Sequence, residues 1–179
     1  MSEPCIKLRL APPTDLFLAG FGFYQLEEDA LYVQLGQADP DSRFFSYIEA
    51  PNMRLDLDRT GRLLFIEVNA GRHTWKAVDD IRPPQSIGYA DIRWLDFRRQ
   101  IPAPSLTCNA PRTSLCIQFS DQPIKCSYYL AESVIVQTTD ENCLAAIIIT
   151  DIIDDLAGQE IAAFRKELRA QSGTKSERQ

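Results

Sequence analysis

The chain has 179 residues, of which 45% are hydrophobic and 25% are charged, and its formal net charge is −6. This composition is that of an ordinary soluble globular protein, and it excludes the disordered, collagen-like and membrane classes. The negative charge makes nucleic acid an unfavourable main partner, because nonspecific binding to phosphate depends on Lys and Arg side chains.

The first half of the chain is predicted to consist of strands. Residues 6–10 alternate apolar and polar side chains, as a half-buried strand does, and Pro12-Pro13 ends the pattern because proline cannot donate to a sheet ladder. Gly61 closes a predicted turn, since glycine takes the positive φ that a tight turn requires. Further strands are predicted at residues 16–24, 31–35, 44–49, 53–57 and 63–68.

The second half repeats this order. Asn142 stands where Gly61 stood, and asparagine is the residue that next best tolerates a left-handed backbone. Residues 144–149 are apolar on both faces, so we expect a central strand that is covered on both sides. The predicted strands are residues 91–97, 115–119, 124–130, 134–138 and 144–149, and residues 82–86 and 101–105 are expected to be connections.

A C-terminal helix is predicted at residues 159–170. Ile161, Phe164 and Leu168 recur there at helical spacing and form an apolar stripe. This helix is the candidate cover for strand 144–149. Residues 171–179 contain no apolar side chain, so we expect a flexible tail.

The two halves also share sequence. Leu-Tyr-Val-Gln-Leu at 31–35 is echoed by Leu-Cys-Ile-Gln-Phe at 115–119, and Ser-Tyr-Ile-Glu-Ala at 46–50 is echoed by Ser-Tyr-Tyr-Leu-Ala at 127–131. These echoes indicate an internal duplication. The predicted fold is therefore mainly β (α+β), with two related antiparallel β-modules packed as one pseudo-symmetric unit. The predicted boundaries are 1–85 for the first module, 86–158 for the second, 159–170 for the helix and 171–179 for the tail.

The first module carries a recognisable motif. Asp29-Ala-Leu-Tyr32 opens a strand, and a later hairpin contains Asp58, Gly61, Arg62, Ile66 and Glu67. Residues 24–68 thereby resemble the small bacterial family catalogued as domain of unknown function twenty-two eighty-three, although Phe65 replaces a glycine of the family pattern. The second module keeps only the apolar pattern. The resemblance implies a compact, mostly β unit without a known reaction, and some members look like the small partner of a ribonuclease-like toxin.

The five cysteines contain no Cys-x-x-Cys pair, so we predict reduced, mostly buried thiols rather than a disulfide framework or a zinc site. The N-terminus has no basic region followed by an apolar stretch, and no apolar run approaches the ~20 residues that a bilayer helix needs. We therefore expect a cytoplasmic protein without a membrane partner.

Catalytic candidates are sparse. His73 is the only histidine and lies among basic residues, and the chain has no Gly-x-Ser-x-Gly, Gly-x-Gly-x-x-Gly or Walker-type motif. We predict no catalytic residue and no cofactor. Two acidic clusters leave a metal site open, because carboxylates bind divalent cations, but we favour a turn at Asp58 and a helix N-terminus after residue 155 as their explanation. The clusters are Asp56/Asp58/Glu67 and Asp151/Asp154/Asp155.

The segment 72–99 is the remaining anomaly, because it contains both tryptophans among many basic residues. Tryptophan and arginine are enriched in interface hot spots, although we favour the explanation that the tryptophans cap the core between the modules. We predict a non-enzymatic interaction module, for example an antitoxin-like one, that binds another protein or itself. The alternative is a small-molecule or metal-binding protein that uses the cleft between the modules. The candidate binding residues are Arg72, His73, Trp75, Lys76, Arg93 and Trp94.

Overall fold

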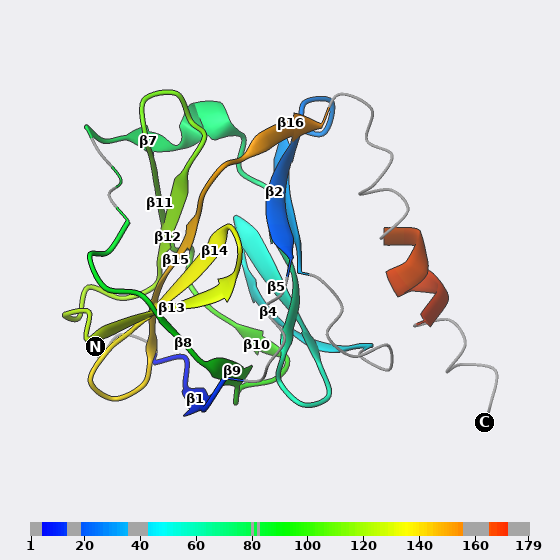
Figure 1. Cartoon of the computed structure of the whole chain (residues 1–179). Helices are drawn as coiled ribbons and strands as arrows, with labels where there is room; N and C mark the ends of the chain where they lie inside the picture. Colours follow the sequence, from blue (N-terminus) through cyan, green and yellow to red (C-terminus); the bar gives the residue numbers. More distant parts are fainter. Residues whose placement is uncertain are drawn as a thin grey trace.

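A computed structural model describes residues 5–13, 19–35, 43–79, 81, 83–155 and 165–171. These residues form three β-sheets and a C-terminal helix at 165–171 (Figure 1). The prediction of a mainly β protein with a C-terminal helix is confirmed. The first part of the predicted helix, residues 159–164, and all of the predicted tail except Gln171 lie outside the described residues, and Gln171 is helical.

The first large sheet has the strand order β10-β4-β5-β6-β3-β2-β16. Its five central strands pair antiparallel, whereas β10 and β16 join the two edges in parallel. Apart from residues 6–10, the strands predicted in the first half correspond to these central strands. The bounds are β2 (Gly20–Gln25), β3 (Ala30–Leu35), β4 (Phe44–Ala50), β5 (Met53–Asp58), β6 (Leu63–Val68), β10 (Arg99–Gln100) and β16 (Ile153–Asp155).

The second large sheet has the strand order β7-β11-β12-β15-β14-β13-β8. Its edge strands β7 and β8 also join in parallel. The predicted strands 134–138 and 144–149 coincide with β14 and β15, but β11 begins at the end of a segment that we expected to be a connection. The bounds are β7 (Lys76–Ala77), β8 (Gly88–Tyr89), β11 (Ser105–Cys108), β12 (Leu115–Gln118), β13 (Cys126–Ala131), β14 (Val134–Thr138) and β15 (Leu144–Ile149).

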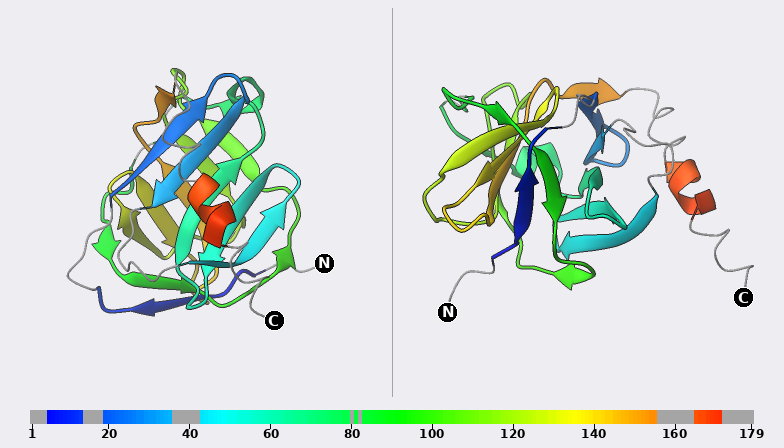
Figure 2. Two further views of the ribbon diagram at one scale, coloured as in Figure 1. Left: turned by 90° about the vertical axis from the view of Figure 1, so that its right-hand side faces the viewer. Right: turned by 60° about the horizontal axis from the view of Figure 1, so that its bottom comes forward.

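Each sheet takes an edge strand from the other half of the chain. After β6 the chain forms the 3-10 helix η1 (Arg72–Thr74) and crosses to β7, which pairs with β11; after β15 it crosses back to β16, which pairs with β2 (Figure 1). A third sheet joins β1 (Leu8–Ala11) to β9 (Asp91–Trp94), and the two strands lie side by side in Figure 2. The halves of the chain are therefore interlocked.

One hydrophobic core lies between the large sheets and draws on both halves. Val33 and Ile66 of the first sheet and Ile117, Val136 and Ile147 of the second are completely buried in the same cluster. Alternation along each strand explains this arrangement, because residues two apart share a face. These side chains fill the space between the two large sheets.

Two hairpin turns hold the β1–β9 ribbon. Gly61 has φ +84°, and Asn142 takes the same left-handed region with φ +56°, which confirms the prediction for Asn142. The Gly61 carbonyl accepts a hydrogen bond of 2.7 Å from the Trp94 N–H, and the Asn142 carbonyl accepts one of 2.9 Å from the Leu8 N–H. Leu8 and Trp94 are themselves opposite one another in the β1–β9 pair, so the turns hold the ribbon from both of its strands.

The prediction that the C-terminal helix covers strand 144–149 is wrong. The C-terminal helix instead lies on the outer face of the first sheet, where Leu168 packs against a buried cluster of Ala30, Tyr32, Leu64 and Phe65 (Figure 2). The reason is topological, because β16 returns the chain to the edge of the first sheet just before the helix. In the second sheet, β7 and β8 are the two opposite edge strands, about 29 Å apart at ~4.8 Å between neighbouring strands. The chain that joins them therefore has to span the width of the sheet.

Two further expectations are corrected. Asp154 and Asp155 belong to β16 rather than to a helix N-terminus. Cys5 and Cys143 are joined by a disulfide with a Cα–Cα distance of 5.4 Å, where we expected reduced thiols. The β-bridge between Lys7 and Cys143 brings the two segments together, and this long-range pairing cannot be read from cysteine spacing. Among the described residues, no helix has the length and apolar character required to cross a membrane.

Candidate functional site

The structure divides the predicted binding residues between two ends of the molecule. Arg72, His73, Trp75 and Lys76 lie in and after η1, whereas Arg93 and Trp94 lie in β9 at the opposite end in Figure 1. Trp75 and Trp94 are 2% and 0% exposed and belong to the core, so neither indole is presented to a partner. This placement matches the favoured interpretation, in which the tryptophans cap the core.

Arg72 and its neighbours form a polar junction where the chain passes between the sheets. The Arg72 guanidinium donates hydrogen bonds of 2.7 and 3.2 Å to Asp154 and lies 4.3 Å from the centroid of the Tyr24 ring. The hydrogen bond to Asp154 raises the pKa of Arg72. The Tyr24 hydroxyl donates to Asp29, and the ring of Trp75 meets the Tyr24 ring edge-on. These contacts join β16 to η1, which is a structural role.

The first acidic cluster is not assembled into one site. The Asp58 carboxylate accepts hydrogen bonds from the N–H groups of Thr60 and Arg62, at 2.8 and 2.9 Å, and so closes the turn as an aspartate at a turn start does. Asp56 and Glu67 instead face a pocket outside the first sheet. Within the part of the chain that the structure describes, no three His, Cys, Asp or Glu residues gather in a way that could hold a metal ion.

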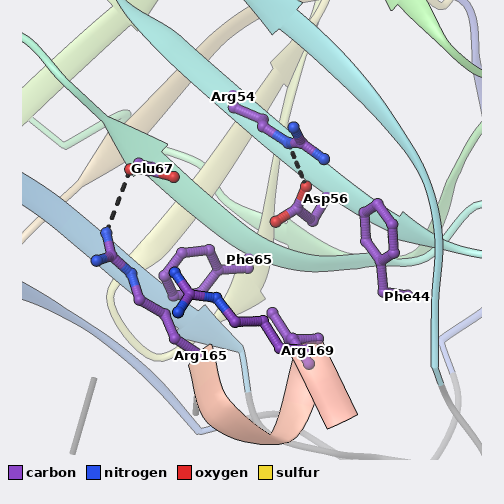
Figure 3. Close-up of a pocket in the computed structure, with 8 residues that line it drawn as sticks. Phe44, Arg54, Asp56, Phe65, Glu67, Arg165 and Arg169 are labelled. Atoms are coloured by element: carbon purple, nitrogen blue, oxygen red, sulfur yellow. Dashed lines mark hydrogen bonds and ion pairs between the residues drawn. The ribbon is translucent and has the colours of Figure 1, made fainter. Parts of the chain in front are cut away.

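That pocket lies between the outer face of the first sheet and the C-terminal helix (Figure 3). Its volume is about 350 Å³, close to the lower limit for small-ligand sites. Burial raises the pKa of both carboxyls that face it, those of Asp56 and Glu67. The lining residues are Phe44, Arg54, Asp56, Phe65, Glu67, Arg165, Leu168 and Arg169.

Beside the pocket, three side chains of the first sheet surround the guanidinium of Arg165. Arg165 forms ion pairs of 3.0 Å with Glu28 and 3.3 Å with Glu67, and its guanidinium carbon lies 4.0 Å from the centroid of the Tyr32 ring. The Tyr32 hydroxyl donates a hydrogen bond to Glu28. Burial strongly raises the pKa of Tyr32, so the phenol stays protonated and keeps its donor. We call Glu28, Tyr32 and Glu67 the guanidinium cage.

Strand register builds the cage. Tyr32 of β3 lies directly opposite Glu67 of β6, and both point outward because Leu31 and Val33 point into the core. The rings of Tyr32 and Phe65 stack at 5.8 Å, which fixes the tyrosine in place. Both Tyr32 and Glu67 belong to the motif that resembles the uncharacterised family, but no sequence pattern indicated that Arg165 would reach them.

The described contacts of the C-terminal helix are few. Exposed ion pairs contribute about 0.2–1 kcal/mol each, and a cation–π contact contributes about 0.5–1 kcal/mol at such a site. Leu168 is only partly buried, so it contributes less than the ~1.5–3 kcal/mol of a fully buried leucine. The described contacts therefore hold this segment to the sheet only weakly.

A second exposed feature surrounds the β1–β9 end of the molecule. Phe45, Phe97 and Leu95 are 37%, 40% and 51% exposed, and the two phenylalanine rings meet edge-on at 5.9 Å. The Arg59 guanidinium lies 5.3 Å from the Phe45 ring centroid. Among the described residues, no carboxylate forms an ion pair with Arg9, Arg59 or Arg98. We call this set the basic–aromatic surface; its members are Arg9, Phe45, Arg59, Leu95, Phe97 and Arg98.

Neither the protein-family models nor the curated proteins compared with the chain include a match. The resemblance of residues 24–68 to the uncharacterised bacterial family stays a prediction from the sequence. Sequence reasoning singled out Arg93, which adjoins this surface through its hydrogen bond to Thr60, and the basic segment that contains Arg98, but it missed Phe45 and Arg59. The signal that could have found them is the pairing of exposed aromatic and basic residues at strand ends, in a chain that is acidic as a whole.

Proposed function

We propose that this protein is a non-enzymatic interaction module that binds an acidic segment of a partner protein through the basic–aromatic surface. The supporting observation is the cluster of exposed Phe45, Leu95 and Phe97 next to arginines that lack carboxylate partners among the described residues. Aromatic and arginine side chains dominate interface hot spots, and charge complementarity selects the partner.

We also propose that the two sheets are copies of one module related by pseudo-symmetry. Support comes from the matching strand orders β4-β5-β6-β3-β2 and β13-β14-β15-β12-β11. The registers agree as well, since Tyr32 opposes Glu67 where Cys116 opposes Ile148. Bulges also occur at the same place in the β5–β6 and β14–β15 pairs.

The duplication gives the basic–aromatic surface to one copy only. In the alignment that places Asn142 on Gly61, Arg59 and Thr60 correspond to Asp140 and Glu141. The turn that is basic in the first copy is therefore acidic in the second. This difference supports a directional contact, and it makes the acidic turn of another copy of the chain a candidate occupant of the basic–aromatic surface.

An antitoxin-like role toward a basic ribonuclease would use an acidic surface. The basic–aromatic surface instead selects an acidic partner. That role, and the cytoplasmic location, remain predictions from the sequence. Both are separate from the proposal for the basic–aromatic surface.

The test compares binding by the wild type and by an Arg59→Asp/Phe97→Ser variant, using cross-linking in cells and sedimentation of the purified protein. Ile153→Ser is the matched control, because Ile153 is an exposed apolar residue on β16, outside this surface. We expect the double variant to lose its partner, or its self-association, while its circular dichroism spectrum and the control stay unchanged. Equal binding by all three proteins would refute the proposal.

A further inference from the structure

We infer that the guanidinium cage is a binding site for an arginine presented by a helix of a partner protein, and that the chain's own Arg165 occupies it in cis. This inference concerns the outer face of the first sheet. It does not depend on the basic–aromatic surface or on the proposal made for that surface.

The chemistry of the cage matches arginine rather than a generic cation. Tyr32 offers a ring face, and Glu28 and Glu67 offer two carboxylates that Arg165 reaches with its two terminal nitrogens. A planar guanidinium can stack on a ring and donate at its edges at the same time, whereas a lysine ammonium is a point charge without a face.

The first sheet builds the cage without help from the helix. Tyr32 is held between paired strands and is stacked on Phe65, and Glu67 lies opposite it in the same register. Glu28 comes from the β2–β3 turn and accepts a hydrogen bond from the Tyr32 hydroxyl. A site made by the sheet persists when the helix leaves, so another arginine can enter it.

The surface beside the cage defines the rest of the recognition element. Leu168 lies three positions after Arg165 and rests on the cluster that contains Leu64 and Phe65. Residues three apart share a helix face, so the docked face presents Arg-x-x-Leu. The pocket of about 350 Å³ continues beyond this face to Phe44 and Arg54 (Figure 3).

Displacement of the cis occupant is favoured by its accessibility. The side chains of Arg165, Glu67 and Glu28 are 26%, 31% and 49% exposed, so water and a competing guanidinium reach the ion pairs. A partner helix with the same Arg-x-x-Leu face would compete directly with the C-terminal segment.

The experiment uses the full chain and a fluorescent peptide that copies its own residues 159–171. The protein variant Arg165→Gln/Leu168→Ser removes the two described anchors of the cis helix, and Lys166→Gln is a control that removes a positive charge from an exposed position on the same helix. We expect the double variant to bind the peptide about tenfold or more tightly than the wild type or the control does, because occupancy in cis lowers the apparent affinity.

Arginine selectivity is tested with a peptide in which Arg165 is replaced by lysine. We expect it to bind the double variant about tenfold more weakly, and we expect Glu67→Gln added to that variant to abolish the preference for arginine. Equal binding of the two peptides, or equal binding by wild type and double variant, would overturn the inference. Binding of free arginine as tight as that of the peptide would also overturn the helix partner, since it would identify a small-molecule site.

If the double variant does not fold, a second measurement on the wild-type protein decides between the outcomes. The wild-type protein is titrated with an excess of the arginine peptide, and the NMR signals of Tyr32 and of the C-terminal helix are followed. We expect the helix signals to move to their undocked positions while Tyr32 stays in a stacked environment. Displacement by the lysine peptide to the same extent would refute a guanidinium site.

Discussion

Replacement of Gly61 by alanine should be among the most damaging single-methyl changes in this protein. Gly61 has φ +84°, a region that costs an L-residue about 1–2 kcal/mol. An added Cβ would also overlap the carbonyl oxygen of Trp94, which is backbone and cannot turn aside. Relief of the overlap would break the 2.7 Å hydrogen bond from the Trp94 N–H to the Gly61 carbonyl, worth about 1 kcal/mol. We expect a total loss of about 3 kcal/mol or more.

Asn142→Ala is the matched control, because it occupies the equivalent turn but already carries a Cβ. The variant should lose only about 1 kcal/mol of unfolding free energy, because asparagine tolerates the left-handed backbone better than alanine does by about this amount. The assay is urea unfolding followed by far-ultraviolet circular dichroism, since Trp94 fluorescence would respond to Gly61 directly. In thermal unfolding, 3 kcal/mol corresponds to a fall of ~6–12 °C for a chain of this size. A loss no larger than that of the control would refute the close contact between the turn and β9.

Three other changes have expected outcomes. Cys5→Ser opens a loop of 138 residues, for which chain entropy gives about 5 kcal/mol, so we expect a loss of about 2–5 kcal/mol that reductant reproduces in the wild type but not in the variant. Asp56→Asn removes a carboxyl whose pKa burial raises, so the folded wild type binds its proton more tightly than the unfolded chain. The penalty is absent below about pH 3.8 and complete above the folded-state pKa, so the variant should gain stability over wild type as the pH rises between these limits. The gain should be about 1.4 kcal/mol for each pH unit that separates the folded and unfolded pKa values, and a gain that is independent of pH would contradict this. Arg165→Gln should raise the pKa of Glu67, because the Arg165 cation lowers it, and carboxyl NMR titration would reveal an unchanged value if the ion pair did not form.

The strands of the two large sheets were accessible from sequence where the pattern was local. Strands β14 and β15 have the predicted bounds, since apolar residues fill them and Asn142 marks the turn between them. The edge strands β7, β8, β10 and β16 were missed because two or three residues are too few to show a period of two. Each of them is defined by its partner strand rather than by its own residues.

The candidate sites follow the same division. Aromatic and basic residues in segment 72–99 attracted attention in the sequence, but burial removed Trp75 and Trp94 from the surface. Phe45 and Phe97 became exposed neighbours only because β10 pairs with β4. Composition shows that such residues are present, whereas exposure depends on which elements cover them.

The sequence by itself determined the mainly β class and the left-handed turns at Gly61 and Asn142. These properties depend on backbone sterics and on neighbours a few positions away. The tertiary structure alone decided the crossing of β7 and β16 between sheets, the Cys5–Cys143 disulfide and the occupant of the guanidinium cage. Each of these joins residues that are far apart in the chain, and their contact is fixed by burial of one common core rather than by any local pattern.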